Sequence, residues 1–546
     1  MKAGKNKRLA NVKTRTETGL EYILSCINLN TPFGKSQLKE IRPFFAGEEE
    51  SLTAELDKVD QMIGFARENP RLVEQIEELF MEVKDVSYTL DRSGKSVLSV
   101  VEIYEVKTLL LQMRKLSKLL EKSDSVPDEY RLEDTTELLD VLDPRGDRIN
   151  TFYIYDEFSE KLGQLRQQKR LIEQDIRREQ KAKRESIRKE YGIQLTPKFD
   201  IMVSRSSGDL EKVKAIADLE LVDEDYMALT FQLKQSGAVF DYVKKMEELN
   251  LQIEEEEETI RARLSQEISE YARCLTGNCR RMGALDLALG KATYAIAHSC
   301  SRPEITKEHV IEIEEGRNLQ VEDILSKKGK KYCPVSISLG DGVTCITGAN
   351  MGGKTISLKL VGQVAILAQY GFFVPCRRAR VGLSNYMHML IGDSQSVERG
   401  LSSFGSEMEE LKEILDNSRE RSVILIDEIA SGTNPVEGLA LTRSLVDYLK
   451  EKPYITLITT HFETVTETEG VINMQVRGLA DADFSKLNRE IQYANRRERI
   501  NVISKYMDYR LYRVQRQGQV PKDALNIAKM LGIGKEIIDG AQKYLK

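Results

Sequence analysis

The spacing of apolar residues divides the chain into a helical first part and a second part in which strands and helices alternate. Residues 17–150 show mostly helical periodicity with few Gly or Pro, and helical periodicity returns over residues 274–325. From about residue 330 to about 500, short apolar runs alternate with helical ones, which is typical of a doubly wound α/β domain. The end of the chain is again helical, with helices expected over residues 522–531 and 535–545.

Two charged helical stretches lie within the first part. Apolar residues recur on one face of each, at Phe158, Leu162, Leu165, Ile172 and Ile176 and again at Val239, Val243, Met246, Ile253, Ile260 and Leu264. Residues 161–190 carry 11 Lys/Arg and 5 Asp/Glu, whereas residues 241–270 carry 4 Lys/Arg and 10 Asp/Glu, so their net charges are +6 and −6. Complementary charge and paired apolar faces favour an antiparallel coiled-coil arm, roughly 50 Å long, over two separate solvated helices.

Composition narrows the class of protein. The chain has 546 residues, 41% of them hydrophobic and 31% charged, so several domains are expected. Its net charge is −6, so the chain lacks the overall basic character that would indicate nucleic-acid binding. The seven cysteines include no C-x-x-C pair, which favours reduced thiols. With no apolar segment at the N-terminus and no run of 18 apolar residues, neither a signal peptide nor a membrane span is expected, and the predicted location is the cytoplasm.

The clearest chemical motif is Gly348-Ala-Asn-Met-Gly-Gly-Lys-Thr355, a complete G-x-x-x-x-G-K-[ST] phosphate loop between an apolar strand and a helical run. Gly348, Gly352 and Gly353 allow the backbone N–H groups to surround a phosphate. Lys354 is expected to reach the β- and γ-phosphates, and the Thr355 hydroxyl to bind Mg²⁺. The cofactors predicted here are therefore ATP and Mg²⁺.

Two further apolar strands end in polar residues. Ser422-Val-Ile-Leu-Ile-Asp-Glu428 ends in two acids, of which Asp427 suits Mg²⁺ and Glu428 suits the attacking water. Ile455 to His461 is the second strand, and His461 is a candidate contact for the γ-phosphate or that water. The loop Ser431-Gly432-Thr433 precedes Asn434, Pro435 and Glu437, which predict a capped helix N-terminus that attracts phosphate.

The motifs together resemble those of the MutS ATPases, in the same order along the chain. The matching segments are the phosphate loop, Asp393–Ser396, Gly400–Met408, Asp427-Glu428, Ser431–Asn434 and Thr460-His461. The chain is most similar to the branch linked to recombination control, strongly over residues 335–546 and more loosely over 17–325. The resemblance implies a P-loop ABC-type α/β ATPase domain that dimerises head to tail, as a homodimer or with a MutS-like partner. It also implies that Ser431, Gly432 and Thr433 act on the partner's nucleotide, that Asn350 contacts nucleotide, and that residues 402–408 couple ATP to the arms.

The resemblance and the residue pattern together predict the organisation of the chain. The expected fold is multidomain, α and α/β: a helical core with a coiled-coil arm, then the ATPase domain and C-terminal helices. The expected segments are a disordered basic tail (1–16), the helical core (17–155 and 275–329), the arm (156–274), the ATPase domain (330–500) and a helical dimerisation segment (501–546). We find no mismatch-reading domain, no Phe-Tyr-Glu motif and no Smr domain, so mismatch recognition is not expected.

The sequence is compatible with two kinds of molecule on which the arm could act, DNA or a protein. The family's arms close on duplex DNA, which predicts an ATP-switched clamp on duplex or branched DNA. The arm tip, residues 195–237, nevertheless holds 5 basic and 8 acidic residues, although a surface that contacts phosphates should be basic. The alternative is a protein-remodelling ATPase, such as the reactivase subunit of a cobalamin-dependent aminomutase.

Overall fold

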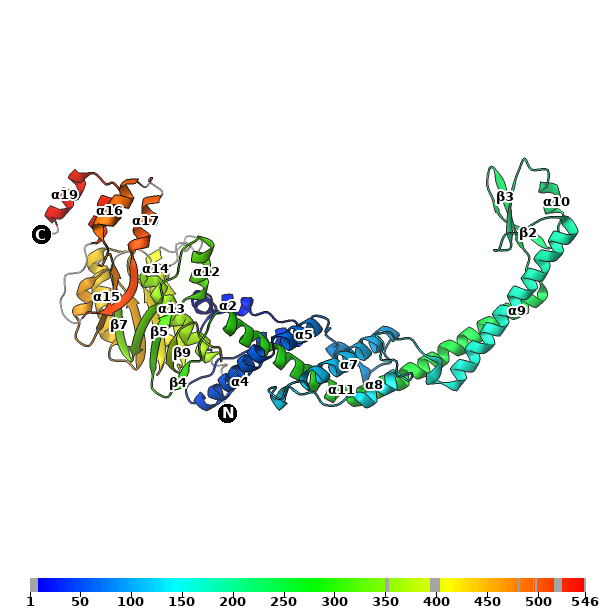
Figure 1. Ribbon diagram of the computed structural model, residues 1–546, viewed down its shortest axis with the longest axis horizontal. Helices are drawn as coiled ribbons and strands as arrows, with labels where there is room; N and C mark the ends of the chain where they lie inside the picture. The colour runs from blue at the N-terminus through cyan, green and yellow to red at the C-terminus, as the bar shows by residue number, and fades with distance from the viewer. Residues whose placement is uncertain are drawn as a thin grey trace. The chain divides into compact units, whose positions relative to one another are not determined.

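The computed structural model describes residues 8–348, 353–392, 403–479, 481–493, 495, 498–514 and 523–544. The chain forms two compact units, one of residues 1–82, 120–131 and 281–546 and the other of residues 83–119 and 132–280. Both contain helices and β-strands, as Figure 1 shows. The expectation of a mixed helical and α/β protein is confirmed, and the strands of the described residues form three sheets. None of the helices in the described ranges is long and apolar enough to cross a membrane.

A six-stranded sheet lies at the centre of the first unit. Its strands, in spatial order, are β13 (Asp508–Arg513), β12 (Ile472–Gly478), β7 (Gly342–Thr347), β11 (Tyr454–Thr459), β10 (Ser422–Asp427) and β9 (Tyr386–Ile391). All neighbouring strands from β12 to β9 are parallel, and β13 is antiparallel to β12. Because parallel strands end at the same edge, the residues that follow β7, β10 and β11 lie together.

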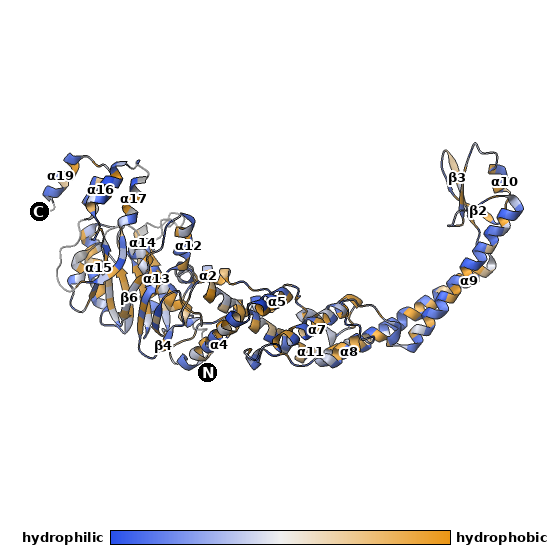
Figure 2. Ribbon diagram, viewed as in Figure 1, coloured by the Kyte–Doolittle hydropathy of each residue, from blue (hydrophilic) through white to orange (hydrophobic). Residues whose placement is uncertain are grey.

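Helices cover both faces of this sheet. On β10, Val423 and Leu425 pack in the core that includes α13 (Gly353–Gln369), whereas Ile424 and Ile426 pack in the core that includes α14 (Ser403–Asn417) and α15 (Pro435–Leu449). A strand buried on both faces needs apolar side chains at every position. Strand β10 therefore reads as a continuous apolar run, and Figure 2 shows hydrophobic colour on ribbons in the α/β part of the chain.

A second sheet corrects the helical return expected over residues 275–329. Helix α11 (Gly237–Ala297) ends in that range, and β4 (Glu304–Thr306) and β5 (Val310–Gly316) follow before α12 (Leu319–Lys327). These strands join β8 (Arg378–Gly382) and β6 (Val335–Gly340) in the order β4-β8-β5-β6. The many charges of this segment resemble a helix surface, but they form cross-strand pairs such as Arg378–Glu304 at 3.0 Å and Arg380–Glu312 at 3.5 Å.

The N-terminal segment is a second correction, because residues 8–16 are not a disordered tail. Leu9 is 1% exposed, and its carbonyl accepts a hydrogen bond from the Met387 N–H of edge strand β9 at 2.7 Å. Asn11 caps helix α1 (Val12–Glu17), and α2 (Leu20–Cys26) follows. The Lys and Arg residues before Leu9 suggested a solvated tail. Within the described part of the chain, however, this segment covers the side of β9 on which no other strand pairs.

The last 46 residues are not purely helical, which is the third correction. Helix α17 (Glu498–Tyr506) is followed by strand β13, which completes the six-stranded sheet beyond the expected boundary at residue 500. Helices α18 (Asp523–Met530) and α19 (Lys535–Tyr544) then follow, close to the ranges expected. Strand β13 was missed because its alternating Tyr, Leu and Arg residues are only half-buried and carry no continuous apolar run.

Helices make up most of the remaining structure. The first unit includes α3 (Pro32–Glu40), α4 (Glu49–Glu68) and α5 (Pro70–Met81), and the second includes α6 (Ser87–Ser93), α7 (Val100–Leu120), α8 (Thr136–Leu142) and α9 (Glu160–Tyr191). Polar contacts join the start of α9 to α11, with Lys161–Glu256 at 2.8 Å and Arg166–Glu257 at 2.7 Å. Between α9 and α11 lie β1 (Asp200–Ser204), α10 (Leu210–Lys214), β2 (Leu219–Glu224) and β3 (Ala228–Leu233), with sheet order β1-β3-β2.

Gly34 illustrates how tightly α3 packs on α11, and it gives a first prediction. A Cβ at Gly34 would lie 2.4 Å from Oδ2 of Asp286, which also accepts hydrogen bonds from the Thr31 N–H and hydroxyl, each at 2.7 Å. Gly34→Ala should therefore lower the free energy of unfolding by about 1–3 kcal/mol. Gly64→Ala, in α4 with open space around the new Cβ, should raise it by up to about 1 kcal/mol. Urea unfolding of both variants checks the pair, and equal effects would contradict this packing.

Candidate functional site

The loop between β7 and α13 begins and ends as the motif requires. Gly348, directly after β7, has φ +123°, a value that L-residues rarely adopt. Gly353 begins α13, and a Cβ there would lie 3.1 Å from Cδ1 of Tyr509 on β13. Asn350 and Gly352, both expected in nucleotide binding, lie outside the described residues. The described ends of the loop thus have the glycines that a tightly curved backbone needs.

The three candidate catalytic residues come together at the carboxyl edge of the sheet. The Lys354 ammonium lies 3.1 Å from Oε1 of Glu428, 3.1 Å from Nδ1 of His461 and 3.1 Å from the carbonyl of Gly348. Nε2 of His461 lies 2.8 Å from the same Glu428 oxygen. Because an ammonium only donates, Nδ1 of His461 accepts and its Nε2–H donates to Glu428. Residues up to 107 positions apart in the sequence therefore form one polar cluster.

Burial and pairing set the charges in this cluster. Burial lowers the pKa of Lys354, although the attraction of Glu428 acts in the opposite direction. For Glu428, burial favours the protonated form, but Lys354 and His461 outweigh it and hold the pKa of Glu428 below its usual value. Glu428 is therefore a carboxylate at neutral pH, which is the form that can accept a proton from water.

Asp427 and Thr355 place two oxygen ligands beside this cluster. The Thr355 hydroxyl donates to Oδ2 of Asp427 at 2.8 Å, and the Thr459 hydroxyl donates to Oδ1 at 2.5 Å. Mg²⁺ prefers a carboxylate and other oxygen ligands, with waters and phosphate oxygens in the remaining positions, and this pair fits that donor set. Thr459 was not among the site residues predicted from the sequence. Its only signal there was a second polar residue at the end of the apolar strand β11.

The backbone after Asp427 is unusual and well anchored. Glu428 and Ala430 have φ values of +49° and +59°, which non-glycine residues seldom adopt. The Glu428 N–H donates to Thr459, and the Ala430 N–H donates to Oε2 of Glu407 on α14 at 3.1 Å. Burial raises the pKa of Glu407, although the bond from Ala430 acts against it. Sequence reasoning assigned no individual role to Glu407.

The loop Ser431–Thr433 is not part of the Lys354 cluster in this chain. Ser431 and Gly432 are exposed, Thr433 is half-buried, and no bond within the described residues joins them to Lys354 or Glu428. Oδ1 of Asn434 accepts the Val436 N–H at 2.9 Å and caps α15, and Pro435 occupies the first turn, as the sequence predicts. The exposed side of α15 carries three large apolar residues, Val436 (76% exposed), Leu441 and Tyr448.

The bond between Glu407 and Ala430 gives a second prediction. Glu407→Ala leaves the buried Ala430 N–H without its acceptor, so we expect a loss of about 1–3 kcal/mol in the free energy of unfolding. It also frees the strained segment that positions Glu428, so for the ATPase that the sequence predicts, ATP turnover should fall while the KM for ATP changes little. Glu407→Gln keeps an acceptor oxygen and should restore most of both properties. Unfolding curves and steady-state kinetics of the two variants test this, and an unchanged turnover in Glu407→Ala would contradict a positioning role.

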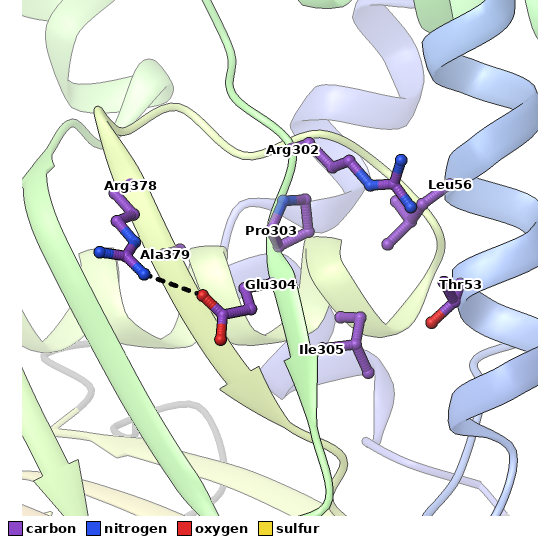
Figure 3. A pocket seen from close by; sticks show the side chains of 8 residues that line it. All are labelled: Thr53, Leu56, Arg302, Pro303, Glu304, Ile305, Arg378 and Ala379. Carbon is purple, nitrogen blue, oxygen red and sulfur yellow. Dashed lines mark hydrogen bonds and ion pairs between the residues drawn. The ribbon is translucent and has the colours of Figure 1, made fainter.

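A separate cavity of about 420 Å³ lies between α4 and the strands β4 and β8, away from this site. Figure 3 shows its lining, in which Arg378 and Glu304 face each other. Arg302, also in the lining, pairs with Asp57 at 2.6 Å. Because both arginines are neutralised by carboxylates of the same unit, this cavity is a weaker candidate for a phosphate site than the cluster around Lys354.

Comparison with known proteins agrees with the geometry. Residues 344–546 match the family model MutS domain V. The chain is 31% identical to the DNA mismatch repair protein MutS of Salinibacter ruber over 335 residues, which is 60% of this chain and 35% of that protein. It is 30% identical to Endonuclease MutS2 of Caldanaerobacter subterraneus subsp. tengcongensis over 314 residues, 56% of this chain and 36% of that protein. A Clostridium botulinum Endonuclease MutS2 is 34% identical over 239 residues, 42% of this chain and 30% of that protein.

The chain thus spans about a third of the length of these curated relatives. The matched domain V begins within β7 and includes the Lys354 cluster, the Asp427 pair and the loop before α15. The chain is thus similar to MutS and MutS2 proteins, and the matched MutS domain V contains all the described residues of the candidate site.

Proposed function

We propose that this protein is an ATPase that hydrolyses ATP to ADP and phosphate with Mg²⁺. The observation that supports it best is the convergence of Lys354, Glu428 and His461 beside the Thr355–Asp427 pair, after three parallel strands. A buried cation, a carboxylate held deprotonated and a pair of metal-ligating oxygens form the set of groups that phosphoryl transfer to water requires. The MutS domain V match points in the same direction.

Each residue has a specific role in this proposal. Gly348, Gly352 and Gly353 allow the N–H groups of the loop to bind phosphate oxygens, Asn350 contacts the nucleotide, and Lys354 neutralises the phosphates. Thr355 and Asp427 would hold Mg²⁺, which neutralises charge on the phosphates when bound. Glu428 accepts a proton from the attacking water, and His461, bonded to both Lys354 and Glu428, orients that water.

We propose further that the site is completed by a second subunit, in a homodimer or a dimer with a MutS-like partner. Ser431, Gly432 and Thr433 sit on an exposed loop, next to the apolar outer side of α15, which suits burial against another chain. We assign residues 501–546 to the same dimer contact, because Ile533 and Ile537 beside and on α19 are exposed. In a head-to-tail dimer the loop of one subunit would bind the nucleotide held by Lys354 of the other.

A mixing experiment tests the shared site. Lys354→Ala and Ser431→Ala subunits should each hydrolyse ATP poorly alone. Mixed, they form dimers with one intact site, built from the Lys354 loop of one chain and the Ser431 loop of the other, so turnover should rise well above the mean of the two variants. If the mixture shows only that mean, the loop does not act across subunits.

We propose DNA as the substrate of the ATP-driven motion, specifically duplex or branched DNA bound without mismatch recognition. The relatives named above, a DNA mismatch repair protein and an endonuclease, support DNA. Helices α9 and α11, paired by ion pairs, would form the coiled-coil arm of the clamp. The test is retention of a four-way junction by the ATP-bound protein, with log affinity falling linearly in log salt concentration.

A second candidate is a protein-remodelling ATPase, such as an aminomutase reactivase. It is favoured by the pairing of tip bases with tip acids: Arg205 with Glu224, Lys212 with Asp209 and Lys214 with Glu211. Lys and Arg side chains that already form ion pairs with acids attract DNA phosphates less strongly. Absence of salt-sensitive junction binding at any nucleotide state would favour this candidate and contradict the DNA proposal.

A further inference from the structure

Strand β2 is an exposed edge of the small tip sheet. In the order β1-β3-β2 it pairs with β3 alone, and the structure describes every residue from 193 to 236. Of its six residues, Leu219 is buried and the other five are exposed. A β-bulge between Leu221 and Asp223 interrupts its register with β3. The outer side of β2 therefore presents backbone that no other strand covers.

Large apolar side chains are exposed along this edge and at the turn that follows it. Leu221 and Val222 on β2 are about half exposed, and Tyr226 and Met227 in the β2–β3 turn are 93% and 69% exposed. The core of the tip is built without them, from residues such as Val213, Leu229 and Phe231. These four apolar side chains lie within seven residues and are not part of this core, so we expect a partner molecule to cover them.

The same segment is strongly acidic. Residues 219–227 contain four acids, Glu220, Asp223, Glu224 and Asp225, and no Lys or Arg. Arg205 pairs with Glu224, whereas Glu220 and Asp223 have no ion pair among the described residues. The N–H groups of Met227 and Ala228 lower the pKa of Asp225, so it is charged at neutral pH. The edge thus combines apolar anchors with uncompensated negative charge.

We propose that residues 219–227, here named the docking edge, bind an extended segment of a partner protein in which Lys or Arg alternates with apolar residues. Such a segment would add as a strand to β2, with its bases opposite Glu220 and Asp223 and its apolar side chains beside Leu221, Tyr226 and Met227. A second copy of this chain does not fit, because two acidic edges repel each other. The acids also disfavour a nucleic acid. The inference goes beyond the proposed ATPase and does not depend on it.

The test uses the full chain and a fluorescent ten-residue peptide of alternating Lys and Val. Binding is measured by fluorescence anisotropy, beside a peptide of the same charge in which proline interrupts the alternation and a labelled 20-base-pair duplex. We expect the alternating peptide to bind at least about tenfold more tightly than the proline peptide, because proline cannot extend a strand. Equal binding of the two peptides would exclude strand addition.

Variants then locate the site. The double charge reversal Glu220→Lys, Asp223→Lys should weaken peptide binding by about tenfold or more. Tyr226→Ser with Met227→Ser, which alters exposed turn residues alone, should weaken it as well without affecting folding. Asp209→Lys with Glu211→Lys, beside and on α10, makes the same change of net charge in the same tip; this double reversal is the matched control and should have little effect. If this control weakens binding as much as the β2 reversal, the proposal is wrong. ATP turnover stays unchanged in all three variants, which separates this result from the proposed ATPase.

Discussion

Replacing Glu428 with Gln is expected to leave ATP binding intact and to slow hydrolysis by at least about 100-fold. The amide keeps an oxygen that can accept from the Lys354 ammonium, so the cluster at 3.1 Å and 2.8 Å retains its bonds. It loses the carboxylate that Lys354 and His461 hold deprotonated, and with it the proton acceptor for water. Equilibrium binding of ATP, single-turnover hydrolysis and steady-state turnover measure these quantities separately.

The matched control for this variant is Glu451→Gln, which removes an exposed carboxylate two residues after the end of α15. It should turn over at the wild-type rate. Wild-type hydrolysis in Glu428→Gln would remove Glu428 from the reaction. Loss of ATP affinity in Glu428→Gln would instead assign this residue to binding, so each outcome has a distinct meaning.

The sequence could predict that Lys354, Glu428 and His461 lie close together, because the polar residues of each motif are adjacent in the sequence and follow an apolar strand. A glycine-rich loop before a helix, and two apolar strands that end in Asp427-Glu428 and in His461, are each visible in the sequence. Parallel strand order then brings their ends together, and the structure places Lys354, Glu428 and His461 within bonding distance. No pattern in the sequence states which strands are neighbours. That order depends on the long-range pairing of β7 with β11 and of β11 with β10.

What the sequence did not reveal depends on tertiary contacts. Thr459 and Glu407 act through single bonds to Asp427 and to the Ala430 N–H, and neither forms a motif. The edge strands β4 and β13 carry charged and half-buried residues, so their periodicity is weak. Leu9 is buried where its carbonyl accepts a hydrogen bond from the Met387 N–H of edge strand β9. In all these cases a neighbour distant in the sequence overrides the local pattern.

Lys354→Ala is expected to weaken ATP binding by about 100-fold or more. Lys354 is 3% exposed, and the contacts of its ammonium with the Gly348 carbonyl, Glu428 and His461 hold it at the phosphate loop. Charge-assisted bonds to phosphate are each worth about 1.5–3 kcal/mol, and ~3 kcal/mol corresponds to roughly 100-fold in affinity. Isothermal titration with ATP and Mg²⁺ measures the loss.

A second effect of the same substitution separates a functional lysine from a structural one. Lys354 is a main cause of the lowered pKa of Glu428, so its removal should raise that pKa. Residual turnover of Lys354→Ala should then decline at a higher pH than wild-type turnover as the solution is acidified, because the base becomes protonated earlier. Lys359→Ala, on the same helix and paired with Glu17 at 2.7 Å, removes a cation away from the loop and should change neither ATP affinity nor the pH profile. If both lysine variants bind ATP normally, the phosphate-loop assignment fails. If both variants lose ATP affinity equally, the loss comes from general destabilisation of α13 and not from the lost phosphate contact.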